Sequence, residues 1–407
     1  MTSADGPSGA DAPTLKRPSQ RIVAFDGARG FMALFVVTWH AFLLVSPSIQ
    51  SWASAHARST GAWWWNVFDP SDFLTYSIVV FFILSGIVIT MPALRPGFSW
   101  WAYYPSRLLR LYLPVWGSLA LGWILIVAFP RGYAPQSTWL GLTNSTHVGV
   151  GEALWQGTLL SQSPGLNNPL WSLTWEIAFS VSLPLYAFIA LKTRNGWLWV
   201  IAASALVSAI GYGTNSLALM YMPTFLIGSV TAANLDKVVA AAAAINSSRR
   251  HTLWWSLILL ASLISISGFR VTESMEFVRP YTLINHVLST TTVLGYAGFL
   301  FIAMGCNSAK RFLGTRPFQW LGARSFSLYL VHVPILATLG FALIGHEWVA
   351  VVIGIPLSIV VAAVYARFVE QPCHRFAKRV GRSWKARAEL RASSRTRLVT
   401  DPGDERV

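Results

Sequence analysis

The chain has 407 residues, of which 54% are hydrophobic and only 12% are charged. A soluble globular protein carries about 25% charged residues, so the composition excludes that class and predicts a polytopic membrane protein. The net charge of +15 does not indicate nucleic-acid binding, because the basic residues lie in short loops and in a terminal tail, as membrane topology requires.

The two ends of the chain differ from its middle. Residues 1–20 are polar and rich in Gly, Pro, Ser and Ala, which predicts a disordered cytoplasmic tail without a cleavable signal. Residues 377–407 are strongly basic and predict a second cytoplasmic tail. The stretch 21–376 between them is expected to form one transmembrane domain. Two cysteines are too few for a disulfide framework.

Apolar runs separated by loop residues predict an all-α membrane bundle of about ten transmembrane helices. In chain order the expected spans are 24–45, 73–93, 111–129, 171–191, 196–212, 216–233, 252–269, 284–305, 325–345 and 348–368. The longest connecting loops are expected at 46–72 and 130–170. Within the second loop, the apolar stretch 153–160 predicts a short surface or half-inserted helix.

Lys and Arg residues set the orientation of these spans, because cytoplasmic loops are enriched in them. With both termini on one side, that side receives 27 of the 31 basic residues. The opposite side receives only Arg58, Arg131, Arg270 and Arg279. The sequence therefore predicts that both termini are cytoplasmic and that the two longest loops are extracytoplasmic.

The first span contains Arg29 near its start and His40 far inside. Eleven helical steps amount to about three turns plus 20°, so the two side chains share one face with a rise of about 16 Å. An imidazole at this depth is expensive unless it faces protein groups or a cavity, which makes it a candidate functional residue. The alternative is an anchoring arginine followed by a packed polar histidine.

Two arginines, Arg107 and Arg110, precede the third span in the sequence RLLR. Residues three apart lie on one helix face, and guanidinium groups bind phosphate through forked hydrogen bonds. They are candidates for binding a phosphate-bearing substrate from the cytoplasm. Anchoring at the membrane surface remains the alternative reading, because every cytoplasmic loop contains basic residues.

The fourth span begins with Trp171 and Ser172 and contains Glu176. Acidic side chains inside a membrane span are rare and are usually functional or paired. We expect Glu176 in the outer half of the membrane, close to His40, where a carboxylate would fix the tautomer of the imidazole and raise its basicity. A buried structural pair is the alternative.

The ninth span carries Tyr329 and His332 in the sequence SFSLYLVH. His332 is a candidate second proton carrier, a candidate substrate ligand, or a hydrogen-bonded core histidine that supports the site. Glu370 ends the tenth span and is expected to pair with a nearby arginine. No metal-binding spacing such as HExxH or CxxC occurs, so no metal is expected.

Six segments in order give the chain its resemblance to a known family. They are AFDGARGFMALFVVTWH, FFILSG, RLLRLYLP, LWSLTWEIAF, SFSLYLVH and VEQP. In these segments the chain resembles the acyltransferase-3 family of integral-membrane O-acyltransferases, which modify hydroxyl groups of bacterial glycans, glycolipids and macrolides. The resemblance covers about residues 21–376.

The resemblance implies roles for several residues. The family's pattern of an arginine, ten residues and a histidine falls on Arg29 and His40, and that histidine is regarded as catalytic. The arginine-rich entry to the third span is proposed to engage the acyl donor. The glutamate after the Trp-Ser-Leu motif falls on Glu176, although Ile177 and Ala178 replace the second polar residue that many relatives carry there.

The sequence therefore predicts an acyltransferase of the cell membrane. It would move an acetyl or short acyl group from acyl-CoA, without a permanently bound cofactor, to a hydroxyl of a cell-envelope sugar or glycolipid. Its partners would be acyl-CoA, a glycan or lipid-linked sugar and the lipid bilayer, with no nucleic acid. A proton-coupled transporter of small molecules is the alternative function, and a membrane scaffold with a recruiting basic tail is a third.

Overall fold

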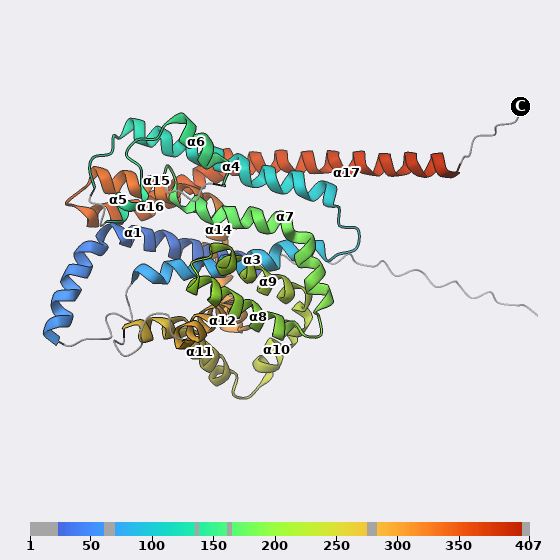
Figure 1. The fold of residues 1–407 in the computed structure, drawn as a ribbon, viewed down its shortest axis with the longest axis horizontal. Helices are drawn as coiled ribbons and strands as arrows, with labels where there is room; N and C mark the ends of the chain where they lie inside the picture. Colours follow the sequence, from blue (N-terminus) through green and yellow to red (C-terminus); the bar gives the residue numbers. More distant parts are fainter. Residues whose placement is uncertain (1–22, 61–69, 135–137, 161–164, 275–282, 401–407) are drawn as a thin grey trace, which may run out of the picture.

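A computed structural model describes residues 23–60, 70–134, 138–160, 165–274 and 283–400. Every regular element in this part of the chain is a helix, which confirms the all-α expectation (Figure 1). The tail expected at 1–20 lies outside the described residues, as do parts of the two long loops.

Each expected apolar span forms a helix. They are α1 (Val23–Thr60), α3 (Pro70–Ala93), α4 (Trp100–Ala128), α7 (Trp171–Lys192), α8 (Trp197–Gly213), α9 (Leu217–Ala233), α11 (His251–Ser274), α12 (Leu283–Gly305), α15 (Ser325–Ala342) and α16 (Glu347–Tyr365). By length and composition, five helices in the described part of the chain can cross a membrane, or up to seven if each of two bent pairs is one span. Three shorter apolar helices accompany them.

The remaining elements are shorter, apart from the last. They are α5 (Trp139–Thr143), α6 (Val150–Gly157), η1 (Asn168–Leu170), α10 (Leu235–Ser247), α13 (Asn307–Leu313), α14 (Arg316–Gly322), η2 (Ala366–Glu370) and α17 (Gln371–Thr400). The short helix expected at 153–160 forms slightly earlier, as α6. The element η2 is a single turn of π-helix between α16 and α17.

Three boundaries differ from the expectation. The region 46–60, expected as a loop, continues α1 as a helix. The third span starts at Trp100 rather than 111, so Arg107 and Arg110 lie inside α4 instead of before it. The basic tail forms the helix α17 up to Thr400, since Ala, Arg, Lys, Glu and Leu favour helix even where they bury little surface.

Helix α15 is the most deeply buried of the five helices that can each cross a membrane. Most of its side chains are buried, among them Leu328, Leu330, Val331 and Leu336. It packs against α1, α4 and α16. A helix that is buried on all sides offers a rigid base for a site, because its side chains are held by close packing.

Helices α3 and α9 approach so closely that only glycine fits where they meet. A Cβ atom on Gly86 would lie 2.9 Å from the Cα atom of Gly228 and would overlap the carbonyl oxygen of Phe225. Small residues allow such contacts between membrane helices. The close approach fixes the rotation of α3 and thereby the direction in which its other side chains, including Ser85, point.

The segment just before α7 enters the bundle between α4 and α15. The side-chain amide of Asn167 donates to the carbonyl oxygen of Leu330 on α15 (2.8 Å) and to Ser118 Oγ on α4 (3.2 Å). Leu166 and Leu170 are buried beside it. Helix α7 therefore begins inside the bundle rather than at its surface.

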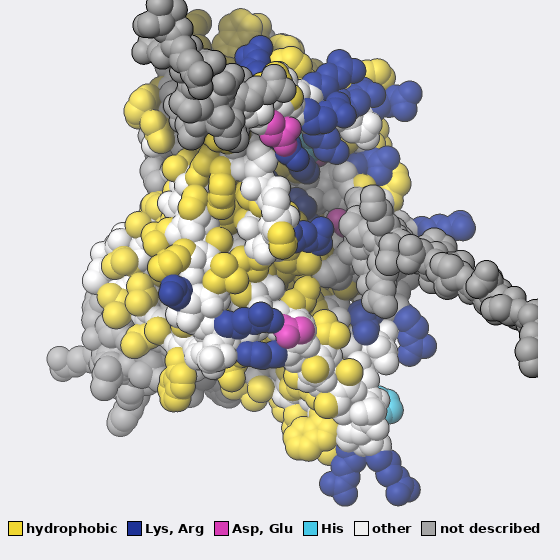
Figure 2. All heavy atoms as spheres, turned by 90° about the vertical axis from the view of Figure 1, so that its right-hand side faces the viewer, with side chains coloured by type: hydrophobic (Ala, Val, Ile, Leu, Met, Phe, Trp, Pro, Cys, Tyr) yellow, Lys and Arg dark blue, Asp and Glu magenta, His cyan; other side chains and the backbone are white. Residues whose placement is uncertain are grey.

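Lys and Arg side chains gather at one end of the bundle. Helix α17 packs against α4 and then projects beyond that end (Figure 1). Figure 2 looks onto it and shows dark blue basic side chains among hydrophobic ones. The starts of α4 and α15 lie toward the same end. The polar groups between these two helices are therefore close to the basic end of the bundle.

Candidate active site

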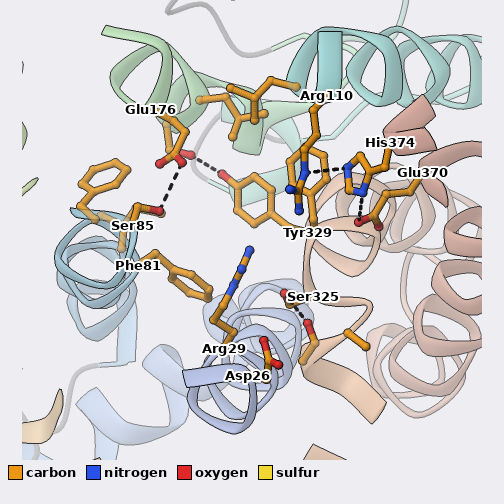
Figure 3. A pocket seen from close by; sticks show the side chains of 18 of the residues that line it. Asp26, Arg29, Phe81, Ser85, Arg110, Glu176, Ser325, Tyr329, Glu370 and His374 are labelled. Carbon is orange, nitrogen blue, oxygen red and sulfur yellow. Dashed lines mark hydrogen bonds and ion pairs between the residues drawn. The ribbon is translucent and has the colours of Figure 1, made fainter. Parts of the chain in front are cut away.

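A polar cleft opens between α1, α3, α4, α7, α15 and α17 (Figure 3). Two adjoining cavities form it and share the side chains of Arg29, Arg107, Arg110, Glu176 and His374. The outer cavity also reaches residues at the start of α4 and on α17, including Tyr103, Ser106 and Lys378. The inner cavity ends at Ser172 and Tyr329.

Glu176 holds Arg107 in the wall of the cleft. The Arg107 guanidinium forms an ion pair with Glu176 Oε1 and donates from Nε to Ser180 Oγ (3.2 Å). Ser85 Oγ on α3 donates to the same Oε1 atom (3.2 Å). The charges of Arg107 and Glu176 therefore compensate each other, and three helices are tied together at this point.

The guanidinium of Arg29 projects into the open space of the cleft, between Glu176, Tyr329 and Arg110 (Figure 3). Among the residues that the structure describes, it forms no hydrogen bond or ion pair, although Glu176 and Asp26 interact with it electrostatically. A planar guanidinium with free donors suits an anionic ligand with paired oxygens. The cleft thus presents a cation that is available for binding.

Two hydroxyl groups close the inner end of the cleft. Tyr329 on α15 donates its phenolic hydrogen to the carbonyl oxygen of Pro169, and Ser172 Oγ lies 2.5 Å from the Tyr329 hydroxyl. The inserted segment before α7 supplies Pro169, which explains how α7 and α15 meet here. Trp171, the neighbour of Ser172, instead packs its ring against Tyr221 on α9.

Beyond Tyr329 lie two histidines. His332 is fully buried one turn further along α15, with its ring centroid 5.9 Å from that of Tyr329. His40 on α1 meets it edge to face, with 4.9 Å between the ring centroids. Arg29 and His40 therefore both face α15, one at the cleft and one beyond it.

The hydrogen bonds of the two imidazoles determine their tautomers. His332 Nδ1 lies 3.0 Å from the Leu328 carbonyl oxygen and 2.8 Å from that of Tyr329. Carbonyl oxygens only accept, so Nδ1 carries the hydrogen and Nε2 has a lone pair. His40 Nδ1 lies 2.9 Å from the Val36 carbonyl oxygen and 3.4 Å from His332 Nε2. It must donate as well, which leaves the lone pair of the neutral His40 ring on Nε2.

A short loop segment covers His40 on the side away from the cleft. The Trp139 ring of α5 lies 5.7 Å from the His40 ring. Arg131 holds the segment by donating to the Ser145 carbonyl oxygen (2.8 Å), with its guanidinium 5.4 Å from the centre of the Phe341 ring. Burial lowers the pKa of Arg131 to about 10, so the side chain remains cationic at neutral pH.

The expectation that Glu176 lies beside His40 is wrong. Glu176 contacts Arg107 and Ser85 in the cleft, whereas the partner of the His40 ring is His332. The reason is the segment before α7, which enters the bundle and places the start of α7 at depth. Glu176 consequently lies at the level of Arg107, about two turns from the first residue of α4.

The cleft wall contains Glu370, predicted from the sequence only as a partner for an arginine, and His374, which the sequence patterns did not indicate. Glu370 lines the inner cavity, and His374 lines both cavities. Residues four apart on a helix lie on one face, so the pair Glu370 and His374 was recognisable as a polar face at the end of the tenth span. Ser85 in the second span also contributes a hydrogen bond to Glu176.

Comparisons with known proteins place the chain in a family. The acyltransferase-3 family, described as an acyltransferase domain, matches residues 22–367. A Bacillus subtilis (strain 168) protein named "Putative peptidoglycan O-acetyltransferase YrhL" is 22% identical over 391 residues, which cover 86% of this chain and 54% of that protein. The chain thus spans about half the length of this curated relative. No solved structure matches the chain.

Proposed function

The chain belongs to the acyltransferase-3 family and is a multi-pass membrane protein; from this premise we propose that it transfers an acyl group from acyl-CoA to a hydroxyl of a cell-envelope glycan or glycolipid. One observation carries the proposal. A cleft lined by arginines ends at two hydroxyl groups, directly beyond which lies a pair of histidines. A binding site for an anionic donor therefore adjoins a candidate base.

The donor would enter the cleft with its phosphates near Arg29 and Arg110. The donors of Arg29 are unused among the described residues, and both side chains line the two adjoining cavities. Arg107 contributes less net charge because Glu176 compensates it. The phosphates and nucleotide of acyl-CoA suit the cationic outer cavity, and the narrow arm that carries the thioester suits the inner one.

The reaction would take place between Tyr329 and His40. His40 Nε2, with its lone pair, accepts the proton of the acceptor hydroxyl while that oxygen attacks the thioester carbonyl carbon. The carbon–sulfur bond then breaks, and the thiolate of CoA takes the proton from His40. The alternative is attack by Nε2 itself, which would carry the acyl group transiently before the hydroxyl displaces it.

Three further side chains support this chemistry in the proposal. His332 Nε2 accepts from His40 Nδ1 and stabilises the imidazolium that forms when Nε2 is protonated. The hydroxyls of Ser172 and Tyr329 close the end of the cleft, and either one would first release its present acceptor, the Pro169 carbonyl oxygen or the other hydroxyl, before donating to the acyl carbonyl oxygen. Glu176 acts through Arg107 in the donor cleft rather than through the histidine.

The acceptor would approach from the extracytoplasmic side. We propose ten spans with both termini cytoplasmic, a catalytic domain over 21–376 and a basic cytoplasmic end over 377–407. The basic end of the bundle in Figure 2 supports this orientation, and the long outer loop that contains Trp139 would meet the acceptor. The name of the Bacillus subtilis relative refers to peptidoglycan, which supports a glycan as the acceptor in this proposal.

The proposal is tested by mass spectrometry of envelope glycans and lipids from cells with and without the gene. We expect one glycan or glycolipid to lose the mass of one acyl group when the gene is deleted and to regain it on complementation. An unchanged envelope, together with solute uptake by liposomes containing the purified protein, would contradict acyl transfer and favour transport.

A further inference from the structure

A series of polar contacts crosses the cleft wall and ends at Arg110. Arg110 Nε donates to His374 Nε2 (3.2 Å), and His374 Nδ1 lies 3.6 Å from Glu370 Oε1. Ser327 Oγ on α15 donates to the other carboxylate oxygen of Glu370. Figure 3 shows the contacts among Arg110, His374 and Glu370 along one side of the cavity. They connect the guanidinium end of a cleft arginine to the rigid helix α15.

The π-helical turn η2 places Glu370 and His374 where these contacts form. A π-turn adds a residue to the helix and rotates the residues after it, and such turns are frequent at functional sites. Glu370 is only 7% exposed at the end of η2, and His374 comes one turn later on α17. A carboxylate buried to this extent requires partners, and Ser327 and His374 supply them.

The contacts also determine which atoms of Arg110 remain available. His374 Nε2 accepts a hydrogen from Arg110, so the neutral imidazole carries its own hydrogen on Nδ1, which faces Glu370. The Nε–H group of Arg110 is used in this bond. Among the described residues, the two terminal NH2 groups of Arg110 form no hydrogen bond, and the side chain lines both cavities.

We propose that His374, held by Glu370, is a positioning residue that orients Arg110 for the phosphate groups of the donor. This inference rests on the proposed function, because it assumes that the donor binds in this cleft. A long side chain at the mouth of a cleft loses rotamer freedom when it binds, and orienting it beforehand reduces that loss. His374 would therefore strengthen donor binding without taking part in the chemistry.

Two polar substitutions of His374 separate positioning from simple structural support. In His374→Gln the amide oxygen reaches the position of Nε2 and can accept from Arg110. In His374→Asn the shorter amide reaches only the position of Nδ1 and keeps the contact with Glu370. The probe is CoA itself, titrated into the full-length protein in lipid nanodiscs. We expect the His374→Asn variant to bind CoA about fivefold to tenfold more weakly than the native protein. The His374→Gln variant should bind CoA within about twofold of the native affinity.

A double-mutant cycle provides the matched control. Combined with Arg110→Ala, the Asn substitution should weaken binding by less than about twofold more, because its effect acts through Arg110. Lys378 lines the outer cavity one turn further along α17, and among the described residues it has no bond to Arg110. Lys378→Ala should weaken CoA binding by the same factor with and without Arg110.

The results distinguish this inference from the function on which it rests. If the native protein binds CoA, equal affinities of the Asn and Gln variants would overturn the positioning role. Additive effects of His374→Asn and Arg110→Ala would overturn it as well. If the native protein does not bind CoA, the assignment of the cleft to the donor is wrong, and the positioning role is lost with it.

Discussion

His332 Nε2 lies 3.4 Å from His40 Nδ1, and the two imidazole rings meet at 68°. Backbone carbonyl oxygens fix the hydrogen of each ring on Nδ1. The second histidine therefore offers a lone pair to the first, and the remaining lone pair of His40 is on Nε2. In this arrangement a neutral imidazole occupies the place that a carboxylate takes in many catalytic triads.

Replacing His332 should slow the reaction without weakening donor binding. His332→Phe retains an aromatic ring and removes one of the two acceptors of His40 Nδ1, leaving the Val36 carbonyl oxygen. We expect kcat to fall about tenfold or more, because the imidazolium loses its partner, while the KM for acyl-CoA remains unchanged. Thr338→Val is the matched control, since Thr338 lies on the same helix and its hydroxyl donates to the Pro334 carbonyl oxygen within that helix. A native kcat in the Phe variant would contradict the positioning role of His332.

Arg29 should act in donor binding. Arg29→Ala is expected to raise the KM for acyl-CoA about tenfold, because a charged hydrogen-bond partner of the phosphates is lost. Arg29→Lys should recover part of the effect, since lysine keeps the charge but not the forked donors. Arg324, which packs over the Trp320 ring, serves as the control arginine. Equal KM values for the native protein and Arg29→Ala would contradict the assignment.

Glu176 and Arg107 should behave as a pair in measurements of stability. Breaking a largely buried ion pair by removing one partner costs about 3–5 kcal/mol, whereas replacing both partners is much less costly. Glu176→Gln should therefore lower the thermal unfolding temperature in detergent, and the double variant Glu176→Gln with Arg107→Gln should recover most of the loss. If Glu176→Gln instead leaves stability unchanged and shifts the pH profile of kcat, Glu176 acts on the histidine after all.

The contact between α3 and α9 predicts a separate effect on stability. Gly86→Ala places a methyl group against the backbone of α9, and overpacking of this kind costs about 1–3 kcal/mol. Gly196→Ala is the control, because a Cβ atom there meets no other atom within 4 Å. Thermal unfolding in detergent compares the two variants. Equal unfolding temperatures would contradict this prediction, because they would show that α3 and α9 can move apart to accommodate the methyl group without a loss of stability.

The helices were largely predictable from the sequence, because apolar runs of sufficient length leave few alternatives in a membrane. The partner of His40 was harder to predict. The sequence predicted Glu176 in the outer half of the membrane at the depth of His40, because a span that begins at Trp171 is expected to begin at the membrane boundary. Asn167 instead anchors an irregular segment between α4 and α15, and no local periodicity indicates such an insertion.

The hydrogen bonds of the cleft wall could not be predicted from short sequence motifs. The π-turn that orients Glu370 has no clear sequence signal, and the bond between Arg110 and His374 joins residues that lie far apart in the chain. By contrast, the common face of Arg29 and His40 is a direct consequence of helix geometry. Local geometry was therefore predictable, whereas contacts between helices required the structure.

The central claim is that His40, just beyond the end of the donor cleft, accepts the proton or the acyl group. The most direct test compares native protein and His40→Ala, expressed at equal levels in cells that lack the gene, by mass spectrometry of the acylated envelope component. We predict that the acyl mass is restored by the native protein and reduced at least about a hundredfold in the variant, while CoA binding in nanodiscs persists. Full acylation by His40→Ala would contradict the claim.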